Sequence, residues 1–230
     1  MTESERERRV ADEPRRSGEP RRGRLRTRAP LIGLIGPIGA GKSTVAGWLA
    51  ERGAVVVDAD ELTRQLMSPG APVTESIIAR FGEYRRTDGS LDRAALGRLV
   101  FSDSARLAEL ESIVHPAVGR VEREAIRAAD SRRPEAIVLE AIKLVEAGHA
   151  AWCDEIWLVV CDPEAQLARL TGRGMDECDA RQRIAAQAAS LPSWRAAATR
   201  TIRTDGSRAD SERAVEAALE EAAASRRRRP

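Results

Sequence analysis

The 230-residue sequence is short of several residue types, and each shortage excludes a class of function. It contains no asparagine, which excludes the Asn-Lys-x-Asp segment that GTP-dependent switch proteins use to recognise guanine. Its cysteines, Cys153, Cys161 and Cys178, match neither a paired metal-ligand spacing nor a Cys-x-x-Cys redox motif. No apolar run approaches the roughly 20 residues needed to span a bilayer. We therefore expect free thiols in a reducing cytoplasm and no membrane partner.

The two ends of the chain are rich in arginine and poor in large apolar side chains. Residues 1–30 hold ten Arg and six acidic residues, so they cannot bury enough surface to offset the entropy of ordering. We expect a disordered tail there and a solvated basic tail over 225–230. Residues 31–224 then form a domain of acidic net charge, long enough to bury a core. The segment LIGLIGPIGAG has four glycines and no fitting cleavage site, which argues against a signal peptide.

Short apolar, β-branched runs predict five strands, at 31–36, 54–60, 135–140, 155–160 and 199–204. Continuous runs of this length suit strands that are buried on both faces of a parallel sheet. The segments between them have helical periodicity, most clearly at 43–53 and 103–129. Strands and helices that alternate in this way predict an α/β fold built from βαβ units.

Two segments are longer or more polar than a simple crossover requires. About 75 residues separate the second and third predicted strands, so we expect a helical insertion at about 67–129. The core would then comprise 31–66 and 130–224. Residues 172–198 are rich in Arg, Gln and Ala, and we expect a helical lid there.

The segment GPIGAGKS, residues 36–43, matches the GxxxxGK[ST] pattern of a phosphate-binding P-loop. It follows a predicted strand and opens a predicted helix, which is the context that the pattern requires. Backbone N–H groups in such a loop surround phosphate oxygens, and the helix N-terminus adds a positive dipole. Lys42 can reach the β- and γ-phosphates, and Ser43 can hold Mg²⁺. The predicted nucleotide contacts are Gly36, Gly39, Ala40, Gly41, Lys42, Ser43 and Thr44.

Lysine and histidine are both rare. Of the 38 cationic residues, 36 are Arg and only Lys42 and Lys143 are Lys. A compact ammonium and a broad guanidinium are not equivalent at a phosphate, so the lysine at 42 is significant. Lys143 follows the third predicted strand, and two interpretations of it remain open: a solvated lysine and a functional one. His115 precedes Pro116 at a predicted helix boundary, where it could form a turn or contact substrate, and we expect a structural or exposed His149.

Asp58 and Asp60 end the second predicted strand at its carboxyl edge, where open α/β sheets place ligands. Both would point to the same side if the strand continued through residue 60. Asp58 also suits the N-cap of the next helix, with Glu61 in the capping-box position. Asp60 is therefore the better candidate for the carboxylate that handles a substrate hydroxyl.

Three further charged residues are candidates for the same site. Glu140 ends the third predicted strand, where P-loop proteins often keep an acidic residue near Mg²⁺. Arg169 and Arg173 lie four apart on a predicted helix, and a like-charge pair at that spacing costs stability unless an anion lies between them. A nucleotide phosphate is one such anion. Alternatively, this helix face is solvated, with Arg173 near Asp176 or Glu177.

Several segments in order resemble the dephospho-CoA kinase family: GLIGPIGAGKSTVA, VVDADELTRQL, DGSLDRAALGRLVF, LESIVHP, PEAQLARLTGR and RIAAQ. They cover most of residues 31–190, and the second to fourth are much more specific than the first. The chain departs from the family's usual residues at Ile35 and Pro37. It has EAIKLVE where a proline-and-leucine segment is usual, and Asp205 before Gly206 where an Asn is frequent.

The resemblance implies phosphorylation of the ribose 3′-hydroxyl of dephospho-CoA by MgATP, giving CoA and ADP. It implies a P-loop NTPase core with a five-stranded parallel sheet flanked by helices, a helical CoA-binding insertion and a lid. By this resemblance Asp60 looks like the base or the group that orients the hydroxyl. Arg169 looks like a contact of the ATP phosphates that would act with Lys42. Ser43 and Glu140 would hold Mg²⁺.

Two other interpretations compete with this one. The first is a P-loop kinase for another small molecule, and the DAD and HP segments argue against it. The second is a basic binding module that acts through its Arg-rich tails. We expect ATP and dephospho-CoA as the partners, no specific nucleic acid, and a cytoplasmic monomer or weak homo-oligomer.

Overall fold

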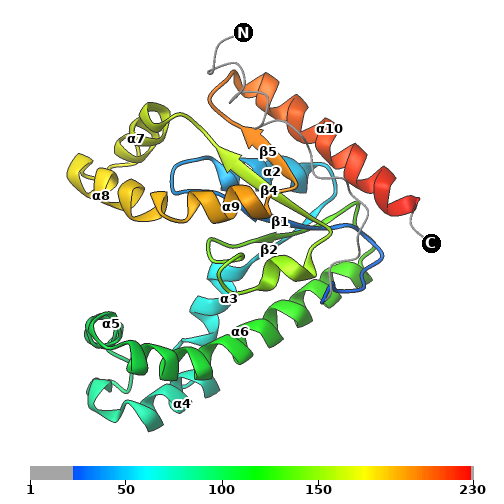
Figure 1. The fold of residues 1–230 in the computed structure, drawn as a ribbon. Helices are drawn as coiled ribbons and strands as arrows, with labels where there is room; N and C mark the ends of the chain where they lie inside the picture. The colour runs from blue at the N-terminus through cyan, green and yellow to red at the C-terminus, as the bar shows by residue number, and fades with distance from the viewer. Residues whose placement is uncertain (1–22, 229–230) are drawn as a thin grey trace.

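A computed structural model describes residues 23–228. Five strands form one sheet in the order β2-β3-β1-β4-β5, and every neighbouring pair is parallel (Figure 1). The strands are β1 (Leu31–Ile35), β2 (Val55–Asp58), β3 (Ile137–Glu140), β4 (Glu155–Val160) and β5 (Arg200–Arg203). Each lies within one of the five predicted runs, so the predicted α/β fold with a five-stranded parallel sheet is confirmed.

Helices occupy the segments between and after the strands. The α-helices are α2 (Lys42–Glu51), α3 (Ala59–Leu66), α4 (Pro72–Arg80), α5 (Arg93–Ser102), α6 (Ser104–Ser131), α7 (Pro163–Thr171), α8 (Glu177–Ala188), α9 (Leu191–Ala197) and α10 (Arg208–Arg227). Two short 3₁₀ helices are η1 (Gly82–Tyr84) and η2 (His149–Trp152). None of the helices within residues 23–228 is long and apolar enough to cross a bilayer.

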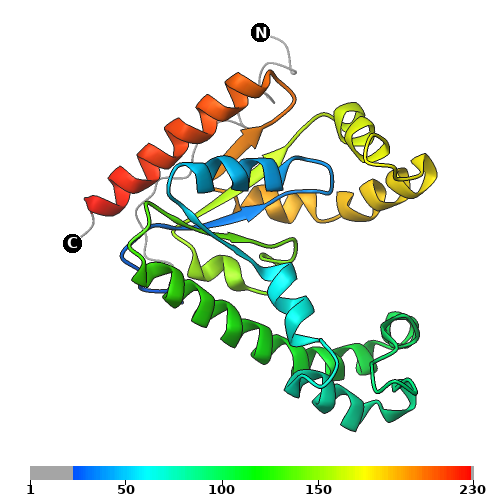
Figure 2. The same ribbon diagram turned by 180° about the vertical axis from the view of Figure 1, so that it is seen from behind.

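The sheet separates two apolar layers, because successive strand side chains point to opposite faces. Ile32 and Leu34 of β1 belong to the cluster that includes Val45 of α2 and Val215 of α10. The other face, with Leu31 and Ile35, belongs to the cluster that includes Ile126 of α6 and Trp194 of α9. Figure 1 shows α6 and α9 in front of the sheet, and Figure 2 shows α2 on the opposite side.

The segment between β2 and β3 is helical, as predicted, and has its own apolar cluster. Val73, Ile77, Phe81 and Leu96 form part of its buried centre. Helices α4 and α5 project from one end of α6, on the side of the molecule where α7 and α8 also project (Figure 1). This arrangement places the insertion beside the core and away from β5.

The predicted helix boundary at His115 and Pro116 is wrong, because α6 continues through both residues. A proline inside a helix removes one backbone hydrogen bond and costs about 3 kcal/mol. Pro116 has no N–H to donate to the Ser112 carbonyl four residues earlier. His115, Pro116 and Ser112 are all exposed, so water can bond to that carbonyl instead. Packing of α6 on α5 at one end and on the sheet at the other offsets this cost.

The expected ends of the domain also need correction. Residues 1–22 and 229–230 lie outside the described residues, but residues 23–30 pack on the body, where Thr27 and Ala29 are buried. At the other end, α10 continues to Arg227. The Arg226 guanidinium donates to the carbonyl oxygen of Thr27, so the two predicted tails contact each other beside the core.

The predicted lid at 172–198 includes one helix that belongs to the core. Trp194 of α9 is only 1% exposed, and its Nε1 donates to Glu146 Oε1 at 2.8 Å. In α8, by contrast, Ala180 is the residue that is buried. The part of this segment that does not belong to the core is therefore α8 with its flanking turns.

Candidate active site at the phosphate loop

The loop between β1 and α2 has the backbone conformation that its glycines predict. Gly36 has φ +150°, and a Cβ on it would lie 2.3 Å from the carbonyl oxygen of Val159 on β4. Gly41, with φ +96°, is the N-cap of α2. The first N–H groups of α2 have no carbonyl within the helix to bond, and together with the helix dipole they favour an anion.

Lys42 lies close to two carboxylates at the carboxyl edge of the sheet. Its Nζ donates to the carbonyl oxygen of Gly36 at 2.8 Å. Burial lowers the pKa of Lys42, and the negative charges of Glu140 and Asp60 act in the opposite direction. The structure therefore brings together the lysine and the carboxylates that the sequence singled out.

Glu140 ends β3 and contacts the phosphate loop through Ser43. The Ser43 hydroxyl donates to Glu140 Oε1 at 3.3 Å. Burial raises the pKa of Glu140, and the charges of Asp58 and Asp60 raise it further, whereas Lys42 and the Ser43 hydrogen bond lower it. These oxygen atoms are the donor type that Mg²⁺ prefers.

The second strand is shorter than predicted, so Asp58 and Asp60 do not lie together on one strand. β2 ends at Asp58, which is the N-cap of α3 and accepts from the Glu61 N–H at 2.9 Å. The capping prediction for Asp58 is confirmed. The reciprocal half of the capping box is not seen, because the Glu61 carboxylate accepts from Gln65 Nε2 instead.

Asp60 lies in the first turn of α3. The Asp60 side chain is exposed, but the protein around its carboxyl group still displaces part of the water, which is the chief reason that its pKa is raised; the nearby charge of Asp58 is the second. The positive charge of Lys42 lowers the same pKa. No hydrogen bond or ion pair within residues 23–228 engages the Asp60 carboxylate. It is therefore available to a substrate hydroxyl.

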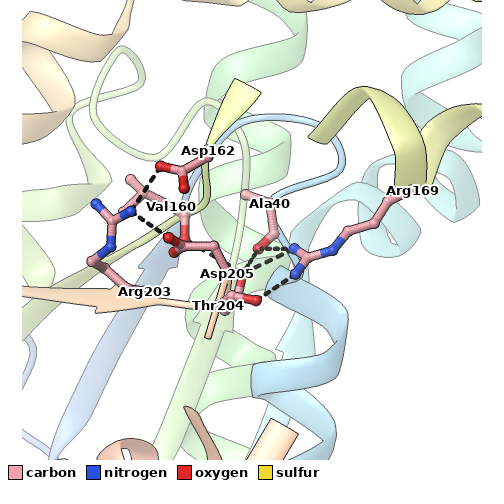
Figure 3. Close-up of polar contacts among 7 residues, drawn as sticks. All are labelled: Ala40, Val160, Asp162, Arg169, Arg203, Thr204 and Asp205. Carbon is pink, nitrogen blue, oxygen red and sulfur yellow. Dashed lines mark hydrogen bonds and ion pairs between the residues drawn. The ribbon is translucent and has the colours of Figure 1, made fainter. Parts of the chain in front are cut away.

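Arg169 of α7 connects the phosphate loop to the end of β5 (Figure 3). Its Nη1 donates to Thr204 Oγ1 at 2.9 Å and lies 3.3 Å from the carbonyl oxygens of Gly39 and Ala40. Its Nη2 donates to the Thr204 carbonyl. The Thr204 hydroxyl donates to the Ala40 carbonyl at 2.6 Å. Arg169 thus positions the outer, carbonyl side of the loop.

A cavity of about 270 Å³ opens next to this network. Its lining residues come from the start of α2, from α7 and its end, and from the segment between β5 and α10: Gly41, Thr44, Trp48, Arg169, Arg173, Thr204, Gly206, Arg208 and Ser211. α7 ends at Thr171, so Arg173 lies beyond the helix on which it was predicted. Both arginines nevertheless line one cavity, as a shared anion requires.

An ion-pair network joins the end of β5 to the loop after β4, and it includes Asp205, where the resemblance described above predicts Asn. Arg203 donates to Asp162 Oδ1 at 2.8 Å and also to Asp205 (Figure 3). The hydrogen bond from Arg203 is the largest influence on Asp205 and lowers its pKa. This network joins the loops that follow β4 and β5, and Gly206 lines the cavity.

The structure also places the candidates whose roles were left open. Lys143 is exposed in the turn after β3. His115 is exposed on α6. His149 is structural: its Nδ1 lies 2.6 Å from Glu122 Oε2, and its ring stacks on Trp152 with the centroids 3.8 Å apart.

Three residues that hold the phosphate loop are not among the predicted site residues. Gln166 donates to the Ile38 carbonyl, Gln187 accepts from the Ile38 N–H at 2.7 Å, and Thr204 bonds Ala40. Both glutamines lie in segments that resemble the family, PEAQLARLTGR and RIAAQ. That resemblance was the available signal, but it did not indicate what the side chains contact.

A P-loop between β1 and α2, a five-stranded parallel sheet and carboxylates at the same edge define a phosphotransferase of the P-loop kinase class. The chain belongs, within that class, to the dephospho-CoA kinase family, whose model matches residues 30–210. ATP-dependent phosphorylation of dephospho-CoA is the activity of this family.

Individual relatives agree with the family assignment. A dephospho-CoA kinase of Symbiobacterium thermophilum is 47% identical over 191 residues, which are 82% of this chain and 79% of the relative. One from Geobacter metallireducens is 46% identical over 161 residues, 68% of this chain and 79% of the relative. The crystal structure of TT1252 from Thermus thermophilus has a TM-score of 0.71 at 35% identity and covers 84% of this chain and 97% of its own.

Proposed function

We propose that this chain transfers the γ-phosphoryl group of ATP to the ribose 3′-hydroxyl of dephospho-CoA and releases CoA and ADP. The observation that supports this most directly is the arrangement of charges around Lys42. Glu140 and Asp60 both act on its pKa, and Glu140 is bonded to Ser43 whereas Asp60 remains available. Glu140 is thus assigned to the nucleotide side of the site, and Asp60 to the acceptor hydroxyl.

In the proposed reaction the ribose oxygen bonds to the γ-phosphorus, and the bond from that phosphorus to the β–γ bridging oxygen breaks. Asp60 takes the proton of the hydroxyl. Lys42 and the amides of the phosphate loop stabilise the charge on the phosphoryl oxygens. We assign Arg169 two roles: it holds the carbonyl side of the loop, and it lines the cavity where it contacts nucleotide phosphates.

Ser43 and Glu140 would hold Mg²⁺ in this proposal. A hydroxyl and a carboxylate that lie 3.3 Å apart supply oxygen donors, and magnesium in kinase sites is completed by substrate phosphates and water. When bound, the ion neutralises charge on the phosphates. Arg169 and Gln166 meanwhile hold the loop, so that its amides and Lys42 face the same nucleotide phosphates.

The two projecting parts of the fold are assigned to the acceptor and to the lid. The insertion, α4 to the first half of α6, has its own apolar cluster and lies on the side where α8 projects, which suits a domain that binds the CoA moiety. α8 contacts the phosphate loop through Gln187. Closure of such a lid excludes water from phosphoryl transfer.

Replacement of Asp60 tests the proposed base. A general base contributes roughly 10² to 10⁴ in rate, and because the hydroxyl loses its proton late in a loose transition state, we expect Asp60→Asn to lower kcat by about 10²-fold. Asp58→Asn is the matched control, since Asn caps a helix as well as Asp does. It should keep kcat within about threefold, because a retained cap leaves α3 in place.

The measurement is steady-state turnover of dephospho-CoA with MgATP by the full chain and both variants. Near-wild-type turnover by Asp60→Asn would contradict the assignment of the base. If Asp58→Asn lost as much activity as Asp60→Asn, the distinction between cap and base would be wrong.

A further inference from the structure

Both backbone polar groups of Ile38, in the phosphate loop, are held by glutamine side chains from different helices. Gln166 of α7 is 5% exposed, and its Nε2 donates to the Ile38 carbonyl. Gln187 of α8 accepts from the Ile38 N–H through Oε1 at 2.7 Å. One glutamine is therefore fixed in a packed helix, and the other belongs to the proposed lid.

The N–H of Ile38 is the first donor in the loop after Gly36. Pro37 has no N–H, so it cannot donate a hydrogen bond to Gln187 in place of Ile38. The carbonyls that follow, on Gly39 and Ala40, already lie against Arg169. Once Gln166 and Arg169 have fixed the carbonyl side, the Gln187 bond determines how firmly the first half of the loop is held.

Helix α8 packs against α7 but has few buried side chains. Ala180 is its buried residue, and its described side-chain ion pairs, Arg181 with Glu177 and Arg183 with Asp179, stay within the helix. Helices that bury little surface open at a low free-energy cost. The Gln187 bond to Ile38 therefore joins a helix with few buried side chains to the phosphate loop.

We propose that Gln187 is a positioning residue that couples docking of α8 to the conformation of the phosphate loop. With α8 docked, Ile38 is fixed on both sides and the loop keeps the shape that surrounds the nucleotide phosphates. When α8 leaves, one of the two contacts is lost and the nucleotide is bound less tightly. The inference rests on the proposed function, because it assigns control of the same nucleotide site.

The test replaces Gln187 by Met, which has a similar shape but offers no comparable acceptor. Gln182→Met is the matched control, since Gln182 is exposed on the same helix. Two quantities are measured on the full chain: hydrogen exchange of the Ile38 amide by NMR, and the KM values for MgATP and for dephospho-CoA. The exchange measurement needs no catalytic activity.

We expect Gln187→Met to speed exchange at Ile38 and to raise the KM for MgATP about 3- to 10-fold, the effect of one neutral hydrogen bond, with the KM for dephospho-CoA unchanged. Gln182→Met should change neither. Unchanged exchange at Ile38, or faster exchange with an unchanged KM for MgATP, would each overturn the coupling. A wild-type chain without turnover would refute the proposed function instead, and equilibrium binding of ATP would then replace KM as the second readout.

Discussion

The pKa of Asp60 is raised and the pKa of Lys42 is lowered, so we expect each of these side chains to limit the pH range of activity. A raised pKa keeps Asp60 protonated, and unable to act as a base, to a higher pH than an ordinary aspartate. Activity should therefore fall as pH decreases through that raised pKa. A lowered pKa makes Lys42 lose its charge at a lower pH than an ordinary lysine, so activity should fall earlier on the alkaline side too.

The pH profile of kcat/KM for dephospho-CoA at saturating MgATP measures both limits. In Asp60→Asn the part of the acid limb that depends on Asp60 should disappear, while the alkaline limb remains. An acid limb with the same midpoint and slope in this variant would show that another group, such as Glu140, is responsible for it.

The loop and helix that form the phosphate site contain two glycines with opposite requirements. Gly36 has φ +150° and a Cβ on it would meet the Val159 carbonyl at 2.3 Å, whereas a Cβ on Gly47 in α2 would meet nothing within 4 Å. Gly36→Ala should destabilise the protein by about 1–3 kcal/mol through backbone strain. It should also abolish ATP binding, because Gly36 lies in the phosphate loop. Gly47→Ala should stabilise the protein by about 0.5–1 kcal/mol.

Urea unfolding and equilibrium binding of ATP measure these two variants. Equal stability of Gly36→Ala and the wild-type chain would contradict the described packing of the loop against β4.

At the level of elements, local sequence was a good guide where local chemistry decides the structure. The five apolar runs became strands, and the glycine loop became the turn into α2. The predictions failed where tertiary packing overrides local preference. Pro116 did not end α6, because packing at both ends of the helix holds it together, and α9 joined the core because it carries Trp194.

At the scale of the whole molecule, His149 connects η2, which precedes β4, to α6. Its Nδ1 lies 2.6 Å from Oε2 of Glu122, whose side chain is 4% exposed. His149→Ala should destabilise the fold by about 1–3 kcal/mol, because it leaves a buried polar group without its partner. His115 is exposed on α6, the helix that carries Glu122, so the free energy of unfolding of His115→Ala should stay within about 0.5 kcal/mol of wild type.

Chemical denaturation with urea distinguishes the two histidine variants. Equal midpoints for both would show that the contact between His149 and Glu122 contributes nothing to stability.

The candidate site could be predicted from sequence only as far as its motifs are local. Lys42, Ser43 and Asp60 could be proposed from sequence because each lies in a short recognisable segment at the end of a strand. The side chains that hold the loop were not found, because their contacts join distant segments: Gln187 lies 149 residues from Ile38, and Thr204 lies 164 residues from Ala40. No spacing rule along the chain reports such a contact.

The proposed function depends above all on dephospho-CoA being the acceptor of the phosphoryl group. The most direct test is ADP release from MgATP by the full chain across a panel of acceptors that includes dephospho-CoA, nucleoside monophosphates and sugars. We expect rapid ADP release with dephospho-CoA, one CoA formed per ADP, and only background release with the other acceptors. Faster release with a nucleotide or a sugar, or none with dephospho-CoA, would contradict the proposed function.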